Sequence, residues 1–293
     1  MAISIAHLGP QGTYAEAAAL AYAQWLKQHQ GRETLLRAYP SIAQTLQASA
    51  SGETDLTVVP VENSIEGGVT ITLDTLWQLD KLQIQHALVL PISHALLSRA
   101  KTLETVSKVY SHPQALAQCQ RWLEQFLPTV RLIPTNSTTE ALQHLDREPS
   151  IGAIASRWAA QLYKLPILAY PINDHSDNCT KFWILSLQPS RQGNHTSIAF
   201  SLPVNAPGAL LKPLQLFAAT NINLSRIESR PTKRSLGDYL FFVDLESDIN
   251  QTHTQAALKA LESCTETLKI FGSYETLSIA DPWQGGYGLE ISS

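Results

Sequence analysis

The sequence predicts an α/β protein of two units: a first unit built on a largely parallel sheet, and a smaller βαββαβ unit after it. Residues 1–188 alternate short apolar runs with helical stretches, which is typical of parallel sheets covered by helices. Residues 189–195 are polar and contain Pro and Gly, as linkers between domains do. Residues 196–275 then show a different order of strand and helix patterns. Two units also suit a chain of 293 residues, because domains commonly span about 100–200 residues.

In the first unit, each predicted strand is a short apolar run that precedes a helical pattern. The first pair is ISIAHL followed by TYAEAAALAYAQWL, where Ala and Leu recur on one helical face. The last strand, FWILSL, is rich in the aromatic and branched residues that favour a buried sheet. The expected strands are 3–8, 55–62, 107–112, 130–134, 151–156 and 182–187, and the expected helices are 13–26, 73–79, 113–126, 137–145 and 157–163.

The second unit has strand and helix patterns in the order βαββαβ, the ferredoxin-like arrangement. Its helix pattern at 209–221 contains Pro213, which a helix tolerates near its first turn. The Gly-rich segment 276–293 is expected to be a tail, with no predicted structure. The expected strands are 195–203, 224–232, 238–247 and 267–275, and the expected helices are 209–221 and 252–266.

Composition and charge exclude several classes of protein. The net charge is −4 without a long basic run, which gives little electrostatic support for nucleic-acid binding. No apolar stretch reaches the roughly 18 residues of a membrane span, and the start is expected to be a strand rather than a signal peptide. The three cysteines show no CxxC pattern and the nine histidines no metal-binding spacing. We therefore expect reduced thiols, a cytoplasmic protein and no metal.

Several predicted helices of the first unit begin with a hydroxyl residue followed three positions later by Glu or Gln, the capping-box spacing. A cap stabilises a helix by about 1 kcal/mol and needs no ligand. However, helix starts that follow parallel strands face a common crevice, and their unpaired N–H groups suit anions. With Gly12 allowing close approach, the pattern favours an anion-binding cleft. The pairs are Thr13–Glu16, Ser41–Gln44, Ser111–Gln114 and Ser137–Glu140.

Polar residues also stand at the ends of two predicted strands. Glu62, Asn63 and Ser64 end the apolar run VVPV, and Thr180 and Lys181 begin the run FWILSL. Side chains at such positions are typical of binding sites in α/β sheets. A turn after the first run and a solvated end of the second are the alternative interpretations.

Seven ordered motifs together resemble the prephenate dehydratases of the phenylalanine branch, over residues from about 3 to 275. The resemblance implies a periplasmic-binding-protein-like (type II) domain with two lobes around a cleft, followed by an ACT domain that binds phenylalanine as feedback inhibitor. It also implies conversion of prephenate to phenylpyruvate, water and carbon dioxide without a cofactor. The motifs are LGPQGTYAEAA, VVPVENSIEGGV, VYSHPQALAQC, NSTTEA, NCTKF, PGAL and IESRPTK.

The resemblance further implies roles for individual residues. Thr180 would donate a hydrogen bond to the leaving hydroxyl, and Lys181 stands where the family usually has Arg, so the charge is kept and the bidentate fork is lost. Tyr14 and Ala15 are smaller departures, from Phe and Ser. Glu62 and Asn63 complete the expected catalytic set, while backbone N–H groups near 136–139 would help bind substrate. The expected substrate-binding residues are Gly12, Thr13, Ser64, Ser111, Gln118, Asn178 and Phe182.

For the second unit, the resemblance implies a phenylalanine site between two ACT domains of a homodimer or homotetramer. Three alternatives remain open: an arogenate dehydratase of the same architecture, a non-catalytic amino-acid sensor, and a secreted solute-binding protein. No chorismate-mutase-like segment precedes residue 3, so we expect an enzyme with one activity. The expected effector residues are Pro207, Gly208, Ala209 and Leu210, and Glu228, Ser229, Arg230 and Pro231.

Overall fold

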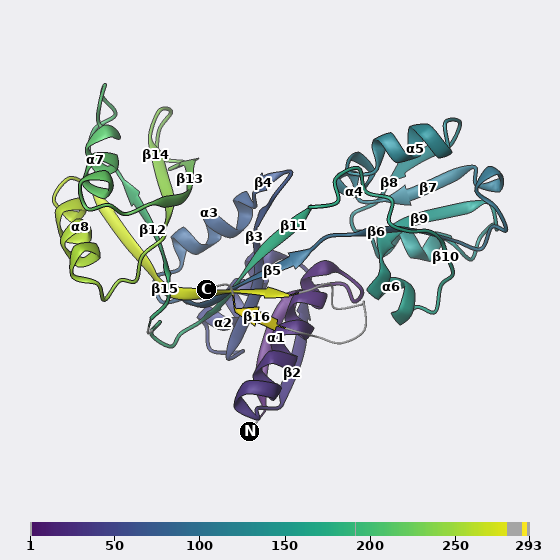
Figure 1. The fold of residues 1–293 in the computed structure, drawn as a ribbon, viewed down its shortest axis with the longest axis horizontal. Coiled ribbons are helices and arrows are strands. Elements are labelled where there is room, and N and C mark those ends of the chain that lie inside the picture. Colours follow the sequence, from purple (N-terminus) through teal and green to yellow (C-terminus); the bar gives the residue numbers. More distant parts are fainter. Residues whose placement is uncertain (1, 191, 280–288, 292–293) are drawn as a thin grey trace.

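The computed structural model describes residues 2–190, 192–279 and 289–291. Figure 1 shows three bodies: a first lobe (residues 2–91 and 178–190), a second lobe (94–170) and a C-terminal unit (195–279). One 11-stranded sheet runs through the first lobe and the C-terminal unit, and a five-stranded sheet forms the second lobe. None of the helices in these described ranges is both long and apolar enough to cross a membrane.

The first lobe has apolar cores on both faces of its sheet. Helix α1 packs its alanine-rich side on one face, against Phe182 and Ile184. The helix begins at the predicted cap, because Thr13 accepts a hydrogen bond from the N–H of Glu16, and it ends at Gly31 with a φ of 62°. The elements are β1 (Ile3–Leu8), α1 (Tyr14–Gln30), β2 (Thr34–Tyr39), α2 (Ile42–Ala50), β3 (Leu56–Asn63), β4 (Gly67–Gly68), α3 (Thr70–Gln78), β5 (Gln83–Pro91) and β11 (Cys179–Ser186).

The second lobe is reached by two chain crossings, between β5 and β6 and between β10 and β11. Its sheet has the order β10-β6-β9-β7-β8. The elements are β6 (His94–Ser98), η1 (Leu103–Thr105), β7 (Lys108–Ser111), α4 (Pro113–Ala117), α5 (Gln120–Phe126), β8 (Arg131–Pro134), η2 (Glu140–His144), β9 (Ile151–Ser156), α6 (Arg157–Leu162) and β10 (Ile167–Ala169).

Three sequence expectations for this lobe need correction. The single helix expected at 113–126 is two helices, because the carboxylate of Asp174 accepts hydrogen bonds from the N–H groups of Arg121 and Trp122 and so caps a new helix start. The helix expected at 137–145 is a short 3₁₀ turn. The cap of α4 is His112 rather than Ser111, because the Ser111 hydroxyl donates instead to the carbonyl oxygen of Ile154.

The C-terminal unit has the predicted βαββαβ order, and its strands follow the order β13-β14-β12-β15. Both helices cover one face around Phe200, Phe217 and Leu261. The opposite face, with Phe242 and Tyr274, packs against Trp183 of the first lobe. The elements are β12 (His195–Ser201), α7 (Leu211–Ala219), β13 (Leu224–Pro231), β14 (Tyr239–Leu245), α8 (Thr252–Glu262) and β15 (Thr267–Ile279), and β16 (Leu289–Ile291) pairs with the far end of β15.

Strand β15 joins the two parts of the long sheet. Its first half pairs with β12, and residues 275–278 pair in parallel with 86–89 of β5. Figure 1 shows this strand extending from the C-terminal unit into the first lobe. The strand therefore continues beyond the expected end of the second unit at 275, while 280–288 and 292–293 of the expected tail lie outside the described residues. The sequence analysis did not identify β2, β5, β6 and β10.

Candidate functional site

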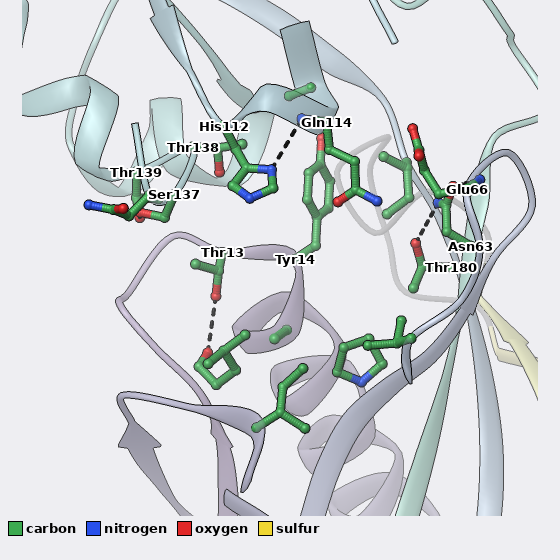
Figure 2. Close-up of a pocket in the computed structure, with 18 of the residues that line it drawn as sticks. Thr13, Tyr14, Asn63, Glu66, His112, Gln114, Ser137, Thr138, Thr139 and Thr180 are labelled. Carbon is green, nitrogen blue, oxygen red and sulfur yellow. Dashed lines mark hydrogen bonds between the residues drawn. The ribbon is translucent and has the colours of Figure 1, made fainter. Parts of the chain in front are cut away.

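A cleft of about 850 Å³ lies where the first lobe faces the second. The first lobe contributes the start of α1, the end of β3 and the start of β11, while the second contributes the loops after β7 and β8. Figure 2 shows Thr13 and Tyr14 on the first lobe, with His112 and Ser137–Thr139 on the opposite side. Strand ends, the start of a long helix and two loops thus hold the polar groups of the cleft.

Thr180 and Asn63 form a hydrogen-bonded pair at one side of this cleft (Figure 2). The Nδ2 of Asn63 donates to Thr180 Oγ1 at 2.9 Å. Its Oδ1 accepts the N–H groups of Ile65 and Glu66, both at 3.1 Å, and these backbone donors fix which end of the amide faces Thr180. The Thr180 hydroxyl therefore acts as acceptor toward Asn63 and donates to no other group in the described part of the chain. Its proton remains available to a molecule in the cleft.

A chain of hydrogen bonds continues from Asn63 through Asn178 to other residues that line the cleft. Asn63 Nδ2 also donates to Asn178 Oδ1 at 2.9 Å, and Asn178 Nδ2 donates to Gln118 Oε1 at 2.9 Å. His94 Nε2 lies 3.0 Å from the same Gln118 oxygen, and His94 Nδ1 lies 3.0 Å from the Tyr14 hydroxyl. Burial lowers the pKa of His94, so its neutral ring donates to Gln118 through Nε2 and has an acceptor at Nδ1.

A β-bulge in β3 decides which polar side chains face the cleft. Lys181 is paired with Glu62, yet Phe182 is paired with Pro60, so Val61 is an extra residue in β3. An extra residue reverses the alternation of side chains along a strand. Asn63 consequently faces the cleft, whereas Glu62 lies on the other face of the sheet.

The expectation that Lys181 and Glu62 lie beside Thr180 in the cleft is therefore wrong. Along β11, Thr180 faces the cleft and Lys181, the next residue, faces the opposite side, as successive strand residues must. Lys181 Nζ lies 3.4 Å from Asp244 of the C-terminal unit. Lys181 and Glu62 both line a rear cavity of about 330 Å³, which comprises Glu62, Ser64, Val89, Cys179, Lys181, His195, Ser225 and Thr276.

Three more expected substrate contacts need the same correction. Ser111 is fully buried and bonded to Ile154. The Gly12 N–H donates to Glu16 Oε2 at 2.6 Å, and a Cβ at Gly12 would lie 2.8 Å from Thr139, so this glycine allows close approach of the lobes. Ser64 lines the rear cavity. Of the remaining expected residues, Thr13, Gln118 and Phe182 line the cleft, and Asn178 supports it from behind.

Anion-binding capacity in the cleft comes from neutral donors. None of the cleft-lining residues in the described ranges is Lys or Arg. The loop at Ser137 carries hydroxyls and backbone N–H groups into the cleft, and Ser137 caps the N–H of Glu140 at 3.0 Å. The start of α1 adds the positive end of a helix dipole. Such N–H groups bind carboxylates without a cationic side chain.

The expected effector residues do not meet in one cavity of a single chain. Pro207–Leu210 form a turn before α7 in which Pro207 and Gly208 are exposed, and Glu228–Pro231 end β13. Neither segment lines the cleft, the rear cavity or the smaller cavity beside Ser201 and Glu266. Arg230 instead donates two hydrogen bonds, at 3.0 and 3.1 Å, to Asp74 of α3.

Glu228 approaches the cleft from the C-terminal unit. A Cβ at Gly68 would clash with its carboxylate, and Gly68 lines the cleft. Burial raises the pKa of Glu228, and together with smaller contributions from Glu62 and Asp244 it outweighs the lowering by Arg226 and Arg230. The expected effector strand therefore contacts the wall of the cleft directly.

The sequence analysis missed two buried polar residues that the fold makes important. His94 starts β6 and continues the chain of hydrogen bonds from Thr180, but a single His before an apolar run has no specific signal. Asp244 offered a better signal, because an acidic residue interrupts the apolar strand YLFFVDL, and buried carboxylates require partners. Among the described residues, no group of three or more His, Cys, Asp or Glu could hold a metal ion.

Comparisons with known proteins agree with this architecture. The prephenate dehydratase family matches residues 5–190, and the ACT domain family matches 196–263. A bifunctional chorismate mutase/prephenate dehydratase of Aquifex aeolicus is 41% identical over 93% of this chain and 73% of its own length. The prephenate dehydratase of Lactococcus lactis subsp. lactis is 34% identical over 95% of this chain and 100% of its own. Prephenate dehydratase from Arthrobacter aurescens, solved in complex with L-Phe, has a TM-score of 0.82 at 33% identity, over 93% of this chain and 90% of its own.

The fold and the cleft define a class: a two-lobed α/β domain of the periplasmic-binding-protein type with a ferredoxin-like domain after it. The expected two-lobed domain and the expected ACT domain are thereby confirmed. The chain belongs to the prephenate dehydratase family, and its C-terminal unit is an ACT domain.

Proposed function

We propose that the cleft between the lobes converts prephenate to phenylpyruvate, with Thr180 as the hydrogen-bond donor to the departing hydroxyl. The observation that supports this proposal most directly is the Asn63–Thr180 hydrogen bond of 2.9 Å. This bond occupies a lone pair of the Thr180 oxygen and leaves the hydroxyl proton free to be donated to a molecule in the cleft. In the reaction, the bond from the ring to its carboxylate breaks and releases carbon dioxide. The electron pair moves into the ring, the bond to the hydroxyl breaks, and the ring becomes aromatic. The departing oxygen takes up one proton from the solvent and leaves as water, so the prephenate dianion and one proton give the phenylpyruvate anion, carbon dioxide and water.

The charges of the groups around Thr180 suit this reaction. A ring carboxylate reacts more readily when it is weakly solvated, and the cleft offers it no Lys or Arg among the described lining residues. The keto-acid side chain would be held by donors at Ser137–Thr139 and at the start of α1. Gln118 lines the cleft with its Oε1 bonded to Asn178, so its amide N–H₂ group can donate to substrate.

A second candidate substrate is arogenate, which carries an ammonium group where prephenate has a keto oxygen. The observation that favours it is the presence of Glu66 in the cleft (Figure 2), where a carboxylate would attract that ammonium group. Prephenate remains the first choice because the curated relatives compared above carry its name.

Steady-state turnover of prephenate and of arogenate, measured side by side, tests this assignment. We expect phenylpyruvate from prephenate and a fall in kcat of about 10²–10³ in Thr180→Ala, with little change in KM. Thr180→Ser is the matched variant, because it keeps the hydroxyl and should keep most activity. Retention of activity in Thr180→Ala would exclude Thr180 as the donor, and preference for arogenate would change the substrate.

We also propose that phenylalanine inhibits the enzyme by binding between the ACT domains of two chains. The prephenate dehydratase of Arthrobacter aurescens was solved with L-Phe bound. Strand β13 is the edge of the long sheet and has Ile227 46% exposed, features that favour a partner chain there. A homodimer or homotetramer would bring Pro207–Leu210 of one chain to Glu228–Pro231 of the next. The free thiols of Cys119, Cys179 and Cys264 suit a cytoplasmic enzyme.

A further inference from the structure

Strand β11 presents one side to the cleft and the other to the C-terminal unit. Thr180 and Phe182 line the cleft. Lys181 contacts Asp244, and the ring of Trp183 lies 5.2 Å from the guanidinium of Arg226. Both partners, Arg226 on β13 and Asp244 on β14, belong to the C-terminal unit. The strand that carries the catalytic hydroxyl is thus held on its rear side by another domain.

Asp244 is the centre of these rear contacts. Its side chain is fully buried. Arg226 donates to both of its carboxylate oxygens, at 3.0 and 3.2 Å, and Ser197 donates to Oδ1 at 2.6 Å. Burial alone would raise the pKa of Asp244, but Arg226 and Lys181 outweigh burial and lower it to about 2. Asp244 is therefore a fixed anion at neutral pH, and Lys181 is bonded to it with only 17% of its side chain exposed.

Lys181 has two acidic neighbours, Glu62 and Asp244, and it contacts only one of them closely. Glu62 is its directly paired neighbour on β3, and such cross-strand pairs of opposite charge commonly attract each other. Nevertheless, the ammonium group of Lys181 lies against Asp244. The contact therefore connects β11 to the C-terminal unit rather than to its own sheet neighbour.

We propose that Asp244 is a positioning residue for Thr180: by holding Lys181, the ACT domain sets the position of β11 at the cleft. This inference rests on the proposed function and adds a route for regulation. Glu228, in the expected effector strand, is paired with Phe242, two residues before Asp244 on β14. A shift of β13 and β14 on effector binding would loosen Lys181 from Asp244, and a small displacement of a catalytic group lowers turnover strongly.

Lys181→Met is the first test, because Met keeps the length of the side chain without its charge. We expect kcat for prephenate to fall about tenfold with KM changed less than about twofold. We also expect the phenylalanine concentration for half-inhibition to change at least about threefold. Lys181→Arg should restore both values, since its guanidinium reaches Asp244. The control is Lys259→Met on the exposed side of α8, which should match the wild type.

A double-mutant cycle with Asp244→Asn tests the pair itself. If Asp244 acts through Lys181, the double variant should lose no more kcat than the more affected single variant. Additive losses, or unchanged kcat and inhibition in Lys181→Met, would overturn the proposal. If Asp244→Asn does not fold, the comparison of Lys181→Met with Lys181→Arg still decides.

Amide hydrogen exchange separates this proposal from the proposed reaction. Lys181→Met should speed exchange at the start of β11 about fivefold or more, whether or not the substrate is prephenate. Unchanged exchange there would contradict a positioning role. Absence of phenylpyruvate from the wild-type enzyme would contradict the proposed reaction alone.

Discussion

Asn63 donates a hydrogen bond of 2.9 Å to Thr180 from the neighbouring antiparallel strand. The two residues are 117 positions apart in the sequence. The same Asn63 amide is oriented by the N–H groups of Ile65 and Glu66, so the turn after β3 determines the direction of the Thr180 proton. The Thr180 hydroxyl is thus oriented by two strands and a turn together.

Asn63→Asp should lower kcat for prephenate about 10²-fold. The new carboxylate oxygen would face Thr180 Oγ1 and Asn178 Oδ1 without a proton to donate, and one misplaced donor commonly costs this much in rate. Asn250→Asp is the matched control, since it makes the same substitution at an exposed position before α8, and it should keep turnover within about threefold. A kcat within threefold of the wild type in Asn63→Asp would show that Asn63 does not orient Thr180.

Tyr14→Phe should lower the free energy of unfolding by about 1 kcal/mol, the usual net value of a buried hydrogen bond. The hydroxyl donates to the Ser93 carbonyl oxygen at 2.7 Å and lies 3.0 Å from His94 Nδ1, at the crossing between lobes. Urea unfolding measures the change. Because Phe is the usual family residue here, kcat should stay within about threefold. A tenfold loss of kcat would instead assign the Tyr14 hydroxyl to catalysis.

Arg230→Ala should raise the phenylalanine concentration for half-inhibition about tenfold or more and leave uninhibited kcat nearly unchanged. The substitution removes a bidentate pair with Asp74 between the ACT domain and α3. Lys233→Ala is the matched control, because Lys233 also contacts Asp74, at 2.7 Å, but its side chain is 62% exposed. Equal effects of the two variants on inhibition would rule out a special role for Arg230.

Stability should fall as the pH decreases from about 6.5 to about 4, and His86 should contribute to this fall. Burial lowers the pKa of His86 to about 4, while the unfolded chain keeps a value near 6.5. The unfolded state therefore binds the proton first, so stability is full above about pH 6.5 and its loss levels off below about pH 4. The loss from this group is at most about 3 kcal/mol.

His86→Gln isolates that contribution. Urea unfolding between pH 7 and pH 4 should show a shallower pH dependence in this variant than in the wild type. Gln keeps a partner for the Tyr22 hydroxyl, which lies 2.9 Å from His86 Nδ1. His253→Gln, at an exposed position of α8, is the matched control for the substitution. Identical slopes for His86→Gln and the wild type would refute the contribution of His86.

Local patterns in the sequence determined the elements that depend on near neighbours. The cap at Thr13, the βαββαβ order of the second unit and the strand FWILSL all agree with the structure. Each depends on residues within one element or one turn, where capping and periodicity act. The family was likewise visible in its ordered motifs, because such motifs preserve local chemistry.

Only the tertiary structure decided which polar residues share the cleft. Lys181 follows Thr180 directly, yet it faces Asp244 because strand residues alternate and the C-terminal unit covers the other side. Glu62 lies outside the cleft because Val61 forms a bulge against β11. Side-chain direction depends on pairing with strands more than a hundred residues away, and no local pattern encodes that pairing. The sequence therefore determined which residues stand at the strand ends, and long-range packing determined which of them line the cleft.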